Sequence, residues 1–267
     1  MKKVFIDGSA GTTGLRIFDR LHRRTDIQLL TLPESERKLE ASRKKMLNEA
    51  DVVFLCLPDD AACEAALWVE NPDTVVLDTS TAHRTAPGWC YGFPELSPVQ
   101  EARLRQAKRI AVPGCHASGF IALVYPLVSA GLLTPDALLS CYSLTGYSGG
   151  GKKMIAEYRA PERSFLLNAP RQYALGQTHK HLKEMKAVTG LANEPVFCPV
   201  VADFYSGMQV TVPLFASWLA PGAGMEDVKN AYRTLYTGPV VSYTDAADEG
   251  GFLSCLLYTS DAADDMQ

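Results

Sequence analysis

The chain has 267 residues, of which 47% are hydrophobic and 21% are charged, and this ordinary globular composition excludes disordered and collagen-like chains. The formal net charge is -4 and the positive residues are scattered, so the sequence offers no basic stripe for nucleic-acid phosphates. It shows neither a signal peptide nor a stretch of about 18 apolar residues, which predicts a soluble, cytoplasmic protein with no membrane or nucleic-acid partner.

Short apolar runs alternate with helix-like segments along the first part of the chain. We expect helices at residues 15–23 and 34–48, and strands at residues 4–6, 27–32, 52–57 and 74–77. This alternation predicts an α/β fold with a Rossmann-type, doubly wound parallel sheet over residues 1–114.

Three glycines follow the first predicted strand and open the first predicted helix. Glycines let the backbone turn tightly and approach a pyrophosphate held at the helix N-terminus. Their spacing is GxxGxxG, so a plain glycine-rich turn without a ligand stays an alternative. The predicted cofactor-binding residues of this loop are Gly8, Ser9, Gly11, Thr12, Thr13 and Gly14.

The second predicted strand ends without the acidic residue that the ribose of NAD would prefer. Ser35, Arg37 and Lys38 follow it instead, and these groups suit the 2′-phosphate of NADP(H). The competing interpretation is a solvated first turn of a helix.

A further predicted strand at residues 109–112 leads to Cys115, which is followed by small residues and an apolar helical stretch at residues 119–130. A helix N-terminus favours the thiolate, the reactive form of cysteine. Cys115 is therefore the candidate nucleophile, whereas the other six cysteines form no CxxC pair and are interpreted as reduced thiols. The sequence predicts no metal site.

Beyond Cys115 the pattern changes to longer strands with interspersed helices. We expect strands at residues 138–144, 195–202 and 208–216, and helices at residues 151–158, 178–189 and 225–236. The pattern predicts a second domain over residues 115–253, of α+β type with a mixed or antiparallel sheet.

Two histidines, His179 and His181, are candidates for the acid-base group that works with Cys115. Imidazole titrates near neutral pH, so one of them could take the thiol proton and later protonate the product oxygen. Two exposed histidines at a helix start are the alternative. His116 is interpreted as a packing residue, because neighbouring residues of a helix point in different directions.

Several blocks together resemble the short form of the N-acetyl-gamma-glutamyl-phosphate reductases of arginine biosynthesis. They are GSAGTTG at residues 8–14, LDTSTAHR at 77–84, YGFPEL at 91–96, VPGCHASGFIALVYPL at 112–127, SGGGKK at 148–153 and HKHLKEM at 179–185. The blocks occur in order over residues 1–253.

This resemblance implies a fold shared with aspartate-semialdehyde dehydrogenases and a reaction in which the cysteine attacks an acyl phosphate. Phosphate would leave, and the resulting thioester would accept hydride from NADPH and yield a semialdehyde. The implied partners are the acyl phosphate or semialdehyde, inorganic phosphate and other copies of the chain in a homodimer or homotetramer.

The resemblance also extends the set of site residues. It implies substrate binding by Arg84 and Lys152, since a guanidinium offers a planar pair of donors to phosphate or carboxylate. A surface arginine is the alternative for Arg84. The cofactor-binding residues that it implies are Ser80, Ser148, Gly149 and Gly150.

Two other functions remain open from the sequence. One is a related reductase acting on aspartyl phosphate or on a carrier-linked aminoadipyl phosphate, because side-chain specificity is not readable from one sequence. The other is a cofactor-sensing Rossmann protein without catalysis, which would need no thiolate at a helix start.

The last residues depart from the family pattern. The segment LLYTSDAADD resembles translated adapter sequence, so we expect residues 254–267 to be a non-native tail. The closing strand, glycine-rich segment and long helix of the family would then be missing.

Overall fold

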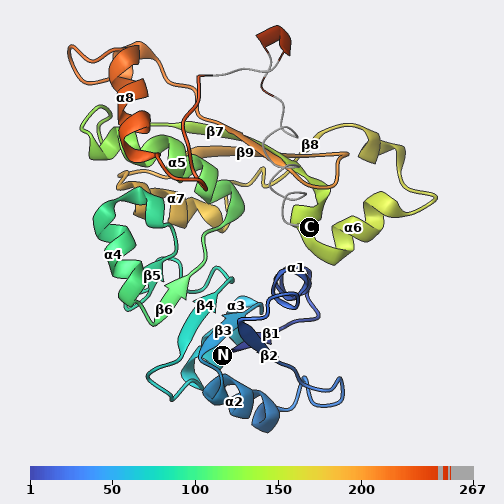
Figure 1. The fold of residues 1–267 in the computed structure, drawn as a ribbon. Helices are drawn as coiled ribbons and strands as arrows, with labels where there is room; N and C mark the ends of the chain where they lie inside the picture. The colour runs from blue at the N-terminus through green and yellow to red at the C-terminus, as the bar shows by residue number, and fades with distance from the viewer. Residues whose placement is uncertain (246–248, 252, 254–267) are drawn as a thin grey trace. The chain divides into compact units, whose positions relative to one another are not determined.

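The computed structural model describes residues 1–245, 249–251 and 253, and the expected non-native tail lies outside these described residues. The chain forms two compact units (Figure 1). Unit 1 consists of Met1–Pro94 and Pro98–Gly114, and unit 2 consists of Glu95–Ser97 and the chain from Cys115 onward.

A parallel sheet forms the centre of unit 1, as the Rossmann-type pattern predicts. Its strands lie in the order β2-β1-β3-β4-β6-β5, and all neighbouring pairs are parallel. The strands are β1 (Lys2–Asp7), β2 (Ile27–Leu30), β3 (Val52–Leu55), β4 (Val75–Asp78), β5 (Cys90–Tyr91) and β6 (Arg109–Ala111). The runs are apolar because such a sheet is covered on both faces.

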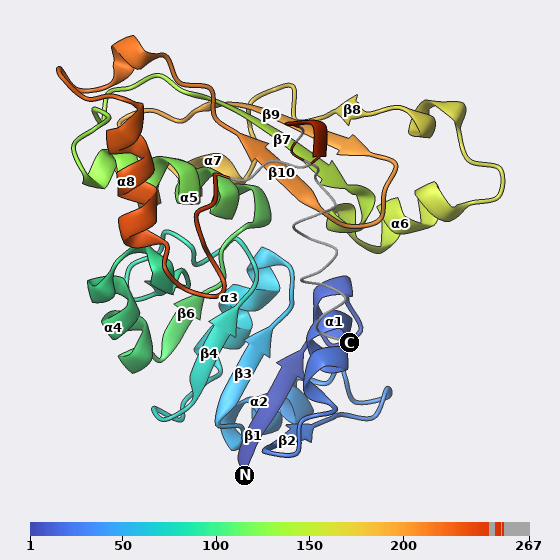
Figure 2. The ribbon, with the colours of Figure 1, turned by 45° about the horizontal axis from the view of Figure 1, so that its top comes forward.

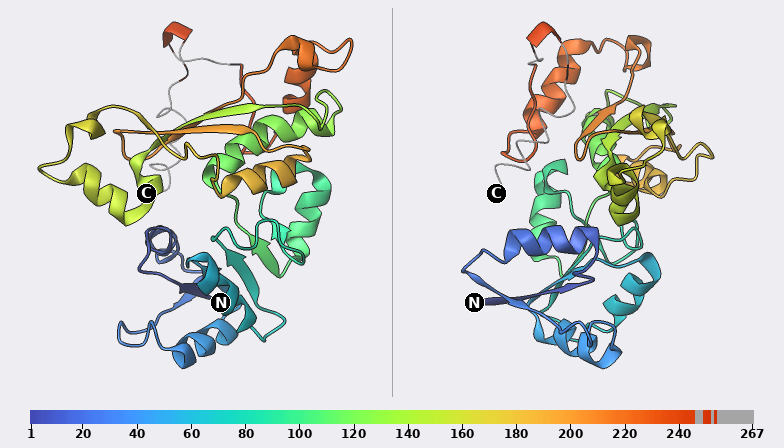
Figure 3. Two further views of the ribbon diagram at one scale, coloured as in Figure 1. Left: turned by 180° about the vertical axis from the view of Figure 1, so that it is seen from behind. Right: turned by 90° about the vertical axis from the view of Figure 1, so that its right-hand side faces the viewer.

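Helices lie on both faces of this sheet. They are α1 (Thr12–Leu21), α2 (Glu40–Glu49), α3 (Asp59–Leu67) and α4 (Pro98–Gln106). In the right-hand view of Figure 3, α1 lies on one side of the sheet, with α2 and α3 on the other. The core on the second side buries Phe5, Leu47, Ala50, Val53, Leu55, Ala65, Val69 and Val76.

The largest differences from the sequence pattern lie at two predicted elements, both of which are shorter in the structure. The helix predicted from residue 34 begins only at Glu40, because the N–H groups of Glu36 and Arg37 both donate to the Pro33 carbonyl and close a turn. The strand predicted at residues 208–216 ends at Thr211, shortly before Pro213, which has no N–H for a ladder. The prediction also missed α3 and α4, each of only nine residues.

A mixed sheet forms the centre of unit 2, as predicted. Its order is β10-β7-β9-β8, in which β7 and β9 are parallel and the other pairs antiparallel. The strands are β7 (Ser140–Gly146), β8 (Arg171–Gln172), β9 (Val196–Ala202) and β10 (Met208–Thr211). The α-helices are α5 (Cys115–Ser129), α6 (Gly151–Arg159), α7 (His181–Thr189) and α8 (Met225–Leu235). Short 3₁₀ helices are η2 (Tyr147–Gly150), η3 (Phe165–Asn168), η4 (Ala216–Trp218) and η5 (Glu249–Gly251).

Helices α5 and α7 lie along one face of the unit 2 sheet (Figure 2). Helix α5 buries Phe120, Ile121, Val124 and Leu127 completely, which fixes its position. Among the described residues, no helix combines the length and the hydropathy that crossing a lipid bilayer requires.

Helix α5 contains Pro126, which has no N–H to donate to the carbonyl of Ala122 one turn earlier. The hydroxyl of Tyr236 donates to that carbonyl at 2.8 Å, and the hydroxyl of Tyr232 donates to the Leu123 carbonyl at 2.6 Å. Two tyrosines at the end of α8 therefore bind the middle of α5 and satisfy the carbonyl that the proline leaves open.

The opposite face of the unit 2 sheet carries exposed apolar side chains. Tyr142 on β7 and Val196 on β9 are 53% and 57% exposed. They alternate with the buried residues Cys141, Ser143 and Phe197, as the two-residue period of a strand requires. This face is apolar enough to pack against another surface.

Candidate active site

The glycine loop follows β1 and forms a tight turn into α1. Gly8 has a φ of +85°, and a Cβ atom there would lie 2.3 Å from the Cys56 carbonyl oxygen. A Cβ atom at Gly14 would lie 2.4 Å from the Gly8 carbonyl oxygen. The turn therefore requires glycine at both positions, and the side chains that would fill the space above the α1 N-terminus are absent.

Replacing Gly8 with alanine is expected to destabilise unit 1 by about 3 kcal/mol or more, because backbone strain and a steric clash add together. Gly88→Ala is a matched control, since Gly88 has a φ of +80° but no atom within 4 Å of the added Cβ. We expect the control to cost about 1–2 kcal/mol. Urea unfolding of both variants measures the difference, and equal losses would contradict the proposed packing at Gly8.

Ser35, Arg37 and Lys38 lie in the turn between β2 and α2, where all three are exposed. The Arg37 Nε donates to the Leu32 carbonyl at 3.4 Å. Their helical alternative is wrong, because α2 begins after them. Their role in binding a 2′-phosphate stays a prediction.

The loop after β4 holds Ser80 and Arg84. The Ser80 hydroxyl donates to the buried carboxylate of Asp78 at 2.6 Å. Arg84 donates from Nε to the Val112 carbonyl at 3.0 Å and from Nη2 to the Thr79 carbonyl at 3.2 Å. Both side chains thus hold unit 1 loops in place, and their predicted contacts with cofactor and substrate stay predictions.

Cys115 is the first residue of α5, and it is exposed. Two other cysteines differ from it in environment. Burial raises the pKa of the Cys56 thiol to about 11 and that of the Cys141 thiol to about 12, so both stay protonated. Among the described cysteines, only Cys63 shares the exposure of Cys115, and Cys63 lies in α3 of unit 1.

Cys115 lines a cavity of about 290 Å³ that lies entirely within unit 2. Both candidate histidines line it as well. The lining residues are Cys115, His116, Thr145, Gly146, Gly149, Gly150, Met154, Tyr173, His179, Lys180, His181 and Val201. The structure thus brings together the predicted cysteine, both histidines and two glycines of the 148–151 turn.

The predicted residues Ser148 and Lys152 are not among the lining residues. Ser148 is half-buried in η2, and Lys152 is exposed at the start of α6. Tyr173 and Lys180 also line the cavity, although neither was predicted from the sequence as a site residue. Nothing in the local pattern around Tyr173 marks it, since β8 has only two residues.

Three imidazole rings cluster around this cavity. The ring centre of His116 lies 5.8 Å from that of His179 and 5.6 Å from that of His181. The backbone N–H of His181 donates to Nδ1 of His179 at 3.2 Å. A neutral His179 ring therefore carries its hydrogen on Nε2 and offers a donor there. Within the described residues, no group of three or more His, Cys, Asp or Glu side chains has metal-site geometry.

The segment before His179 is held by a side-chain clamp. Gln177 donates to the Phe197 carbonyl and accepts from the Phe197 N–H, both at 2.8 Å. Ala174 and Gln177 have φ values of 52°, a conformation that is unfavourable for residues with a Cβ. Since strained backbone persists only where its surroundings fix it, the clamp explains how this segment keeps its shape.

His116 is buried, as its interpretation as a packing residue anticipates. Burial, followed by the nearby His179, lowers its pKa from 6.5 to about 4. The ring is therefore neutral at physiological pH. Its two nitrogens lie 2.6 Å from the Ser143 hydroxyl and 2.8 Å from the Tyr173 hydroxyl.

The lowered pKa of His116 makes stability depend on pH. Below pH 6.5 the unfolded chain takes up a proton that the folded ring rejects until about pH 4, so acid lowers the free energy of unfolding. Protonation linked to His116 alone should lower the free energy of unfolding by about 2 kcal/mol between pH 7 and pH 5. Urea unfolding should show a weaker pH dependence for His116→Gln, whereas the exposed control His22→Gln should match the unmodified chain.

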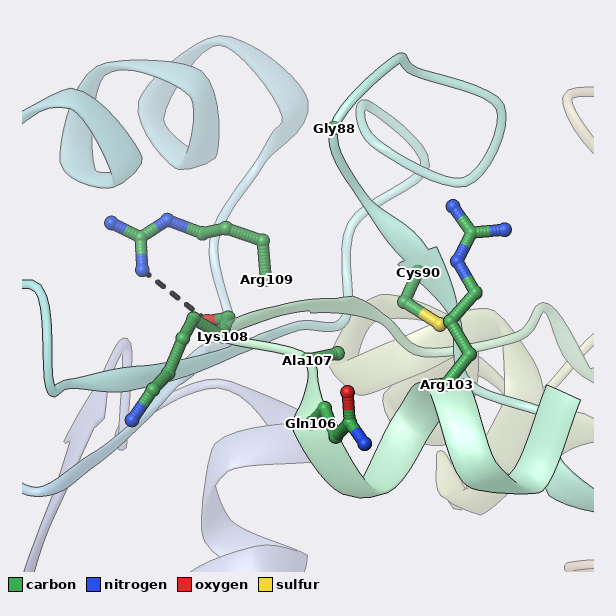
Figure 4. Close-up of a pocket in the computed structure, with 7 residues that line it drawn as sticks. All are labelled: Gly88, Cys90, Arg103, Gln106, Ala107, Lys108 and Arg109. Atoms are coloured by element: carbon green, nitrogen blue, oxygen red, sulfur yellow. Dashed lines mark hydrogen bonds between the residues drawn. The ribbon is translucent and has the colours of Figure 1, made fainter. Parts of the chain in front are cut away.

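A second cavity of about 290 Å³ lies in unit 1 and is lined by Gly88, Cys90, Arg103, Gln106, Ala107, Lys108 and Arg109. Figure 4 shows the Lys108 and Arg109 side chains pointing away from Cys90 and Arg103. Lys108 donates to the Asp73 carbonyl, and Arg109 donates to the Thr74 and Val69 carbonyls. The cavity therefore does not concentrate these positive charges.

Two family models match the chain. The semialdehyde dehydrogenase NAD-binding domain matches residues 3–104, and the semialdehyde dehydrogenase dimerisation domain matches residues 115–249. The chain is 43% identical over 265 residues to an N-acetyl-gamma-glutamyl-phosphate reductase of Rhizobium meliloti. The aligned part covers 98% of this chain and 86% of that relative. It is 42% identical over 261 residues to the enzyme of the same name from Trichormus variabilis, covering 94% of this chain and 81% of the relative.

Solved structures of low sequence identity share the fold. Aspartate semialdehyde dehydrogenase II from Vibrio cholerae, complexed with ASA, superposes with a TM-score of 0.64 at 14% identity, covering 88% of this chain and 79% of that one. Aspartate semialdehyde dehydrogenase with NADP from Candida albicans gives a TM-score of 0.60 at 19% identity, covering 88% and 77%.

Proposed function

Because this chain belongs to the N-acetyl-gamma-glutamyl-phosphate reductase family, we propose that it reduces N-acetyl-gamma-glutamyl phosphate to N-acetylglutamate 5-semialdehyde and phosphate with NADPH, in arginine biosynthesis. The observation that carries the proposal is Cys115, an exposed thiol at the start of α5 that shares a cavity with His179 and His181.

The chemistry follows from the position of the sulfur. The N-terminus of a helix favours a thiolate, which attacks the acyl carbon of the substrate. A carbon–sulfur bond forms, the bond from that carbon to the phosphate oxygen breaks, and phosphate leaves with the electron pair. After reduction of the thioester, the carbon–sulfur bond breaks, the aldehyde is released and the thiolate is restored.

His179 is our choice for the group that donates to the oxygen of the reacting carbon. Its Nδ1 accepts from the His181 N–H, so a neutral ring presents Nε2–H as a donor. His181 is buried at the start of α7, which suits a supporting position. Lys180, between them, adds positive charge to the cavity, which favours a substrate that carries phosphate.

The first unit carries an NAD(P)-binding domain, and the glycine loop fits a dinucleotide, because Gly8 and Gly14 leave the α1 N-terminus open to a pyrophosphate. NADPH supplies hydride when bound. Ser9, Gly11, Thr12 and Thr13 complete the proposed loop, and Arg37 and Lys38 favour NADP over NAD. Ser80, Ser148, Gly149 and Gly150 are proposed as further cofactor contacts, and Arg84 and Lys152 as substrate contacts.

A homodimer is the proposed assembly, with a tetramer as the larger form. The family model for residues 115–249 is a dimerisation domain, and the exposed sheet face with Tyr142 and Val196 offers the apolar surface that such a contact needs. Light scattering should report the mass of a dimer for the unmodified chain and of a monomer for Tyr142→Glu. An unchanged mass in the variant would contradict the placement of the interface on this sheet face.

The proposed location is the cytoplasm, because a cysteine nucleophile needs a compartment that keeps thiols reduced.

The substrate is tested with the purified chain in the reverse direction. Phosphate-dependent reduction of NADP by N-acetylglutamate semialdehyde should exceed that by aspartate semialdehyde by at least about 100-fold in kcat/KM. Comparable rates with the two aldehydes would overturn the substrate assignment and favour the related reductase of aspartyl phosphate.

A further inference from the structure

A chain of hydrogen bonds runs from the sheet of unit 2 to the cavity of Cys115. It begins at Ser143 on β7, passes through His116 on α5 and ends at Tyr173, directly after β8. The Ser143 Oγ lies 2.6 Å from His116 Nδ1, and the His116 Nε2 lies 2.8 Å from the Tyr173 Oη. The reaction described above gives these three side chains no role.

His116 has a single hydrogen to share between these two partners. Burial and the neighbouring His179 hold its pKa near 4, so the ring is neutral at physiological pH. A neutral imidazole donates from one nitrogen and accepts at the other. The position of that hydrogen decides the direction of both hydrogen bonds.

Ser143 fixes the position of this hydrogen. Its side chain is fully buried, and His116 is its only hydrogen-bond partner among the residues that the structure describes. If Nδ1 carried the hydrogen, the serine O–H would have no acceptor in a dry environment, which is unfavourable. The serine therefore donates to Nδ1, and the ring hydrogen lies on Nε2.

Tyr173 then receives a hydrogen bond and keeps its own O–H for another acceptor. Its hydroxyl accepts from His116 Nε2, and the ring lines the cavity that also contains Cys115. Burial, followed by the charge of Cys115, raises the pKa of Tyr173 to about 12, so the hydroxyl stays protonated. A charged Cys115 is close enough to disfavour a tyrosinate.

We propose that Ser143 and His116 are positioning residues that direct the Tyr173 O–H into the cavity, where it donates to the acyl oxygen of the substrate attached at Cys115. This inference rests on the proposed function, because it assigns the donor to the oxygen on the carbon that the sulfur attacks. A donor aimed at that oxygen stabilises the negative charge that develops on it during attack and reduction. Tyr173 would thus be a catalytic residue beside His179.

The hydrogen-bond directions are tested first, by a measurement that needs no activity. Nitrogen-15 NMR of histidine-labelled protein reports which ring nitrogen carries hydrogen, and His116→Gln identifies the His116 signals. We expect the Nε2–H tautomer in the unmodified protein and a shift toward Nδ1–H in Ser143→Ala. A neutral His116 with its hydrogen on Nδ1 in the unmodified protein would overturn the proposal.

The catalytic role is tested by kinetics with N-acetylglutamate semialdehyde, NADP and phosphate. Tyr173→Phe should lower kcat by about 10²-fold to 10³-fold with KM changed less than about threefold, because the hydrogen bond strengthens in the transition state. Ser143→Ala should lower kcat by about tenfold. Combining the two changes should add no further loss to Tyr173→Phe, since the serine acts through the tyrosine.

A conservative variant separates positioning from packing. The amide of His116→Gln can still donate toward Tyr173, so it should retain more of kcat than His116→Leu, which has no donor. Equal kcat in these two variants, or a Tyr173→Phe variant within about threefold of the unmodified kcat, would overturn the catalytic role. Inactivity of the unmodified protein would count against the proposed function instead, and would leave the tautomer measurement valid.

Discussion

Cys115→Ser is expected to abolish turnover, with a loss of kcat of more than about 10⁴-fold. A serine hydroxyl is far less acidic than a thiol, so it would not be ionised at the start of α5 and would not form the acyl intermediate. The measurement is phosphate-dependent reduction of NADP by N-acetylglutamate semialdehyde, followed by absorbance of the reduced nicotinamide.

Cys63→Ser is the matched control, because Cys63 is also exposed but lies in α3 of unit 1. It should retain the unmodified rate. Circular dichroism and NADP titration should be unchanged in the Cys115 variant, because neither the core nor the glycine loop is altered. Appreciable turnover by Cys115→Ser would rule out covalent catalysis by this residue.

His179→Asn is expected to lower kcat by about 10²-fold to 10⁴-fold, the range that a positioned acid-base group contributes. The ring lines the Cys115 cavity, and the bond from the His181 N–H to its Nδ1 directs Nε2–H away from the backbone. The assay for Cys115 serves here, repeated across pH 6 to pH 9 to detect loss of an ionisation from the rate profile.

His181→Asn should cost less than about tenfold if His179 is the donor to the substrate, because His181 would act only by supporting the loop. The exposed His22→Asn should match the unmodified rate. A larger loss of kcat for the His181 variant than for the His179 variant would make His181 the donor to the substrate. Losses of kcat below tenfold in both variants would show that neither histidine acts in the reaction.

The strand-to-helix transition at Cys115 and the glycine loop could be predicted from the sequence, because each is a local pattern with one physical cause. It also predicted the two kinds of sheet, since a parallel sheet with covered faces and a mixed sheet differ in strand length and alternation. For the helix predicted at residues 34–48 only the start was wrong, because a turn closed on Pro33 competes with helix formation before Glu40.

The residues that surround Cys115 in the fold could not be predicted from local sequence patterns. Tyr173, directly after β8, and Ser143, on β7, are 57 and 27 residues away from His116 along the chain. Their proximity depends on the pairing of β7, β8 and β9, which no local periodicity encodes. The Gln177 clamp on Phe197 has the same origin, because it joins a loop to a strand 20 residues later.

The proline in α5 has a consequence for folding of the chain during its synthesis on the ribosome. The carbonyl of Ala122 obtains its hydrogen bond from Tyr236, which is 114 residues later in the chain. At a translation speed of about 5–20 residues per second, roughly 6 to 23 s pass between synthesis of the two residues. During that interval the Ala122 carbonyl lacks this hydrogen bond, so we expect the helix that begins with Cys115 to be fully stabilised only after Tyr236 has been synthesised.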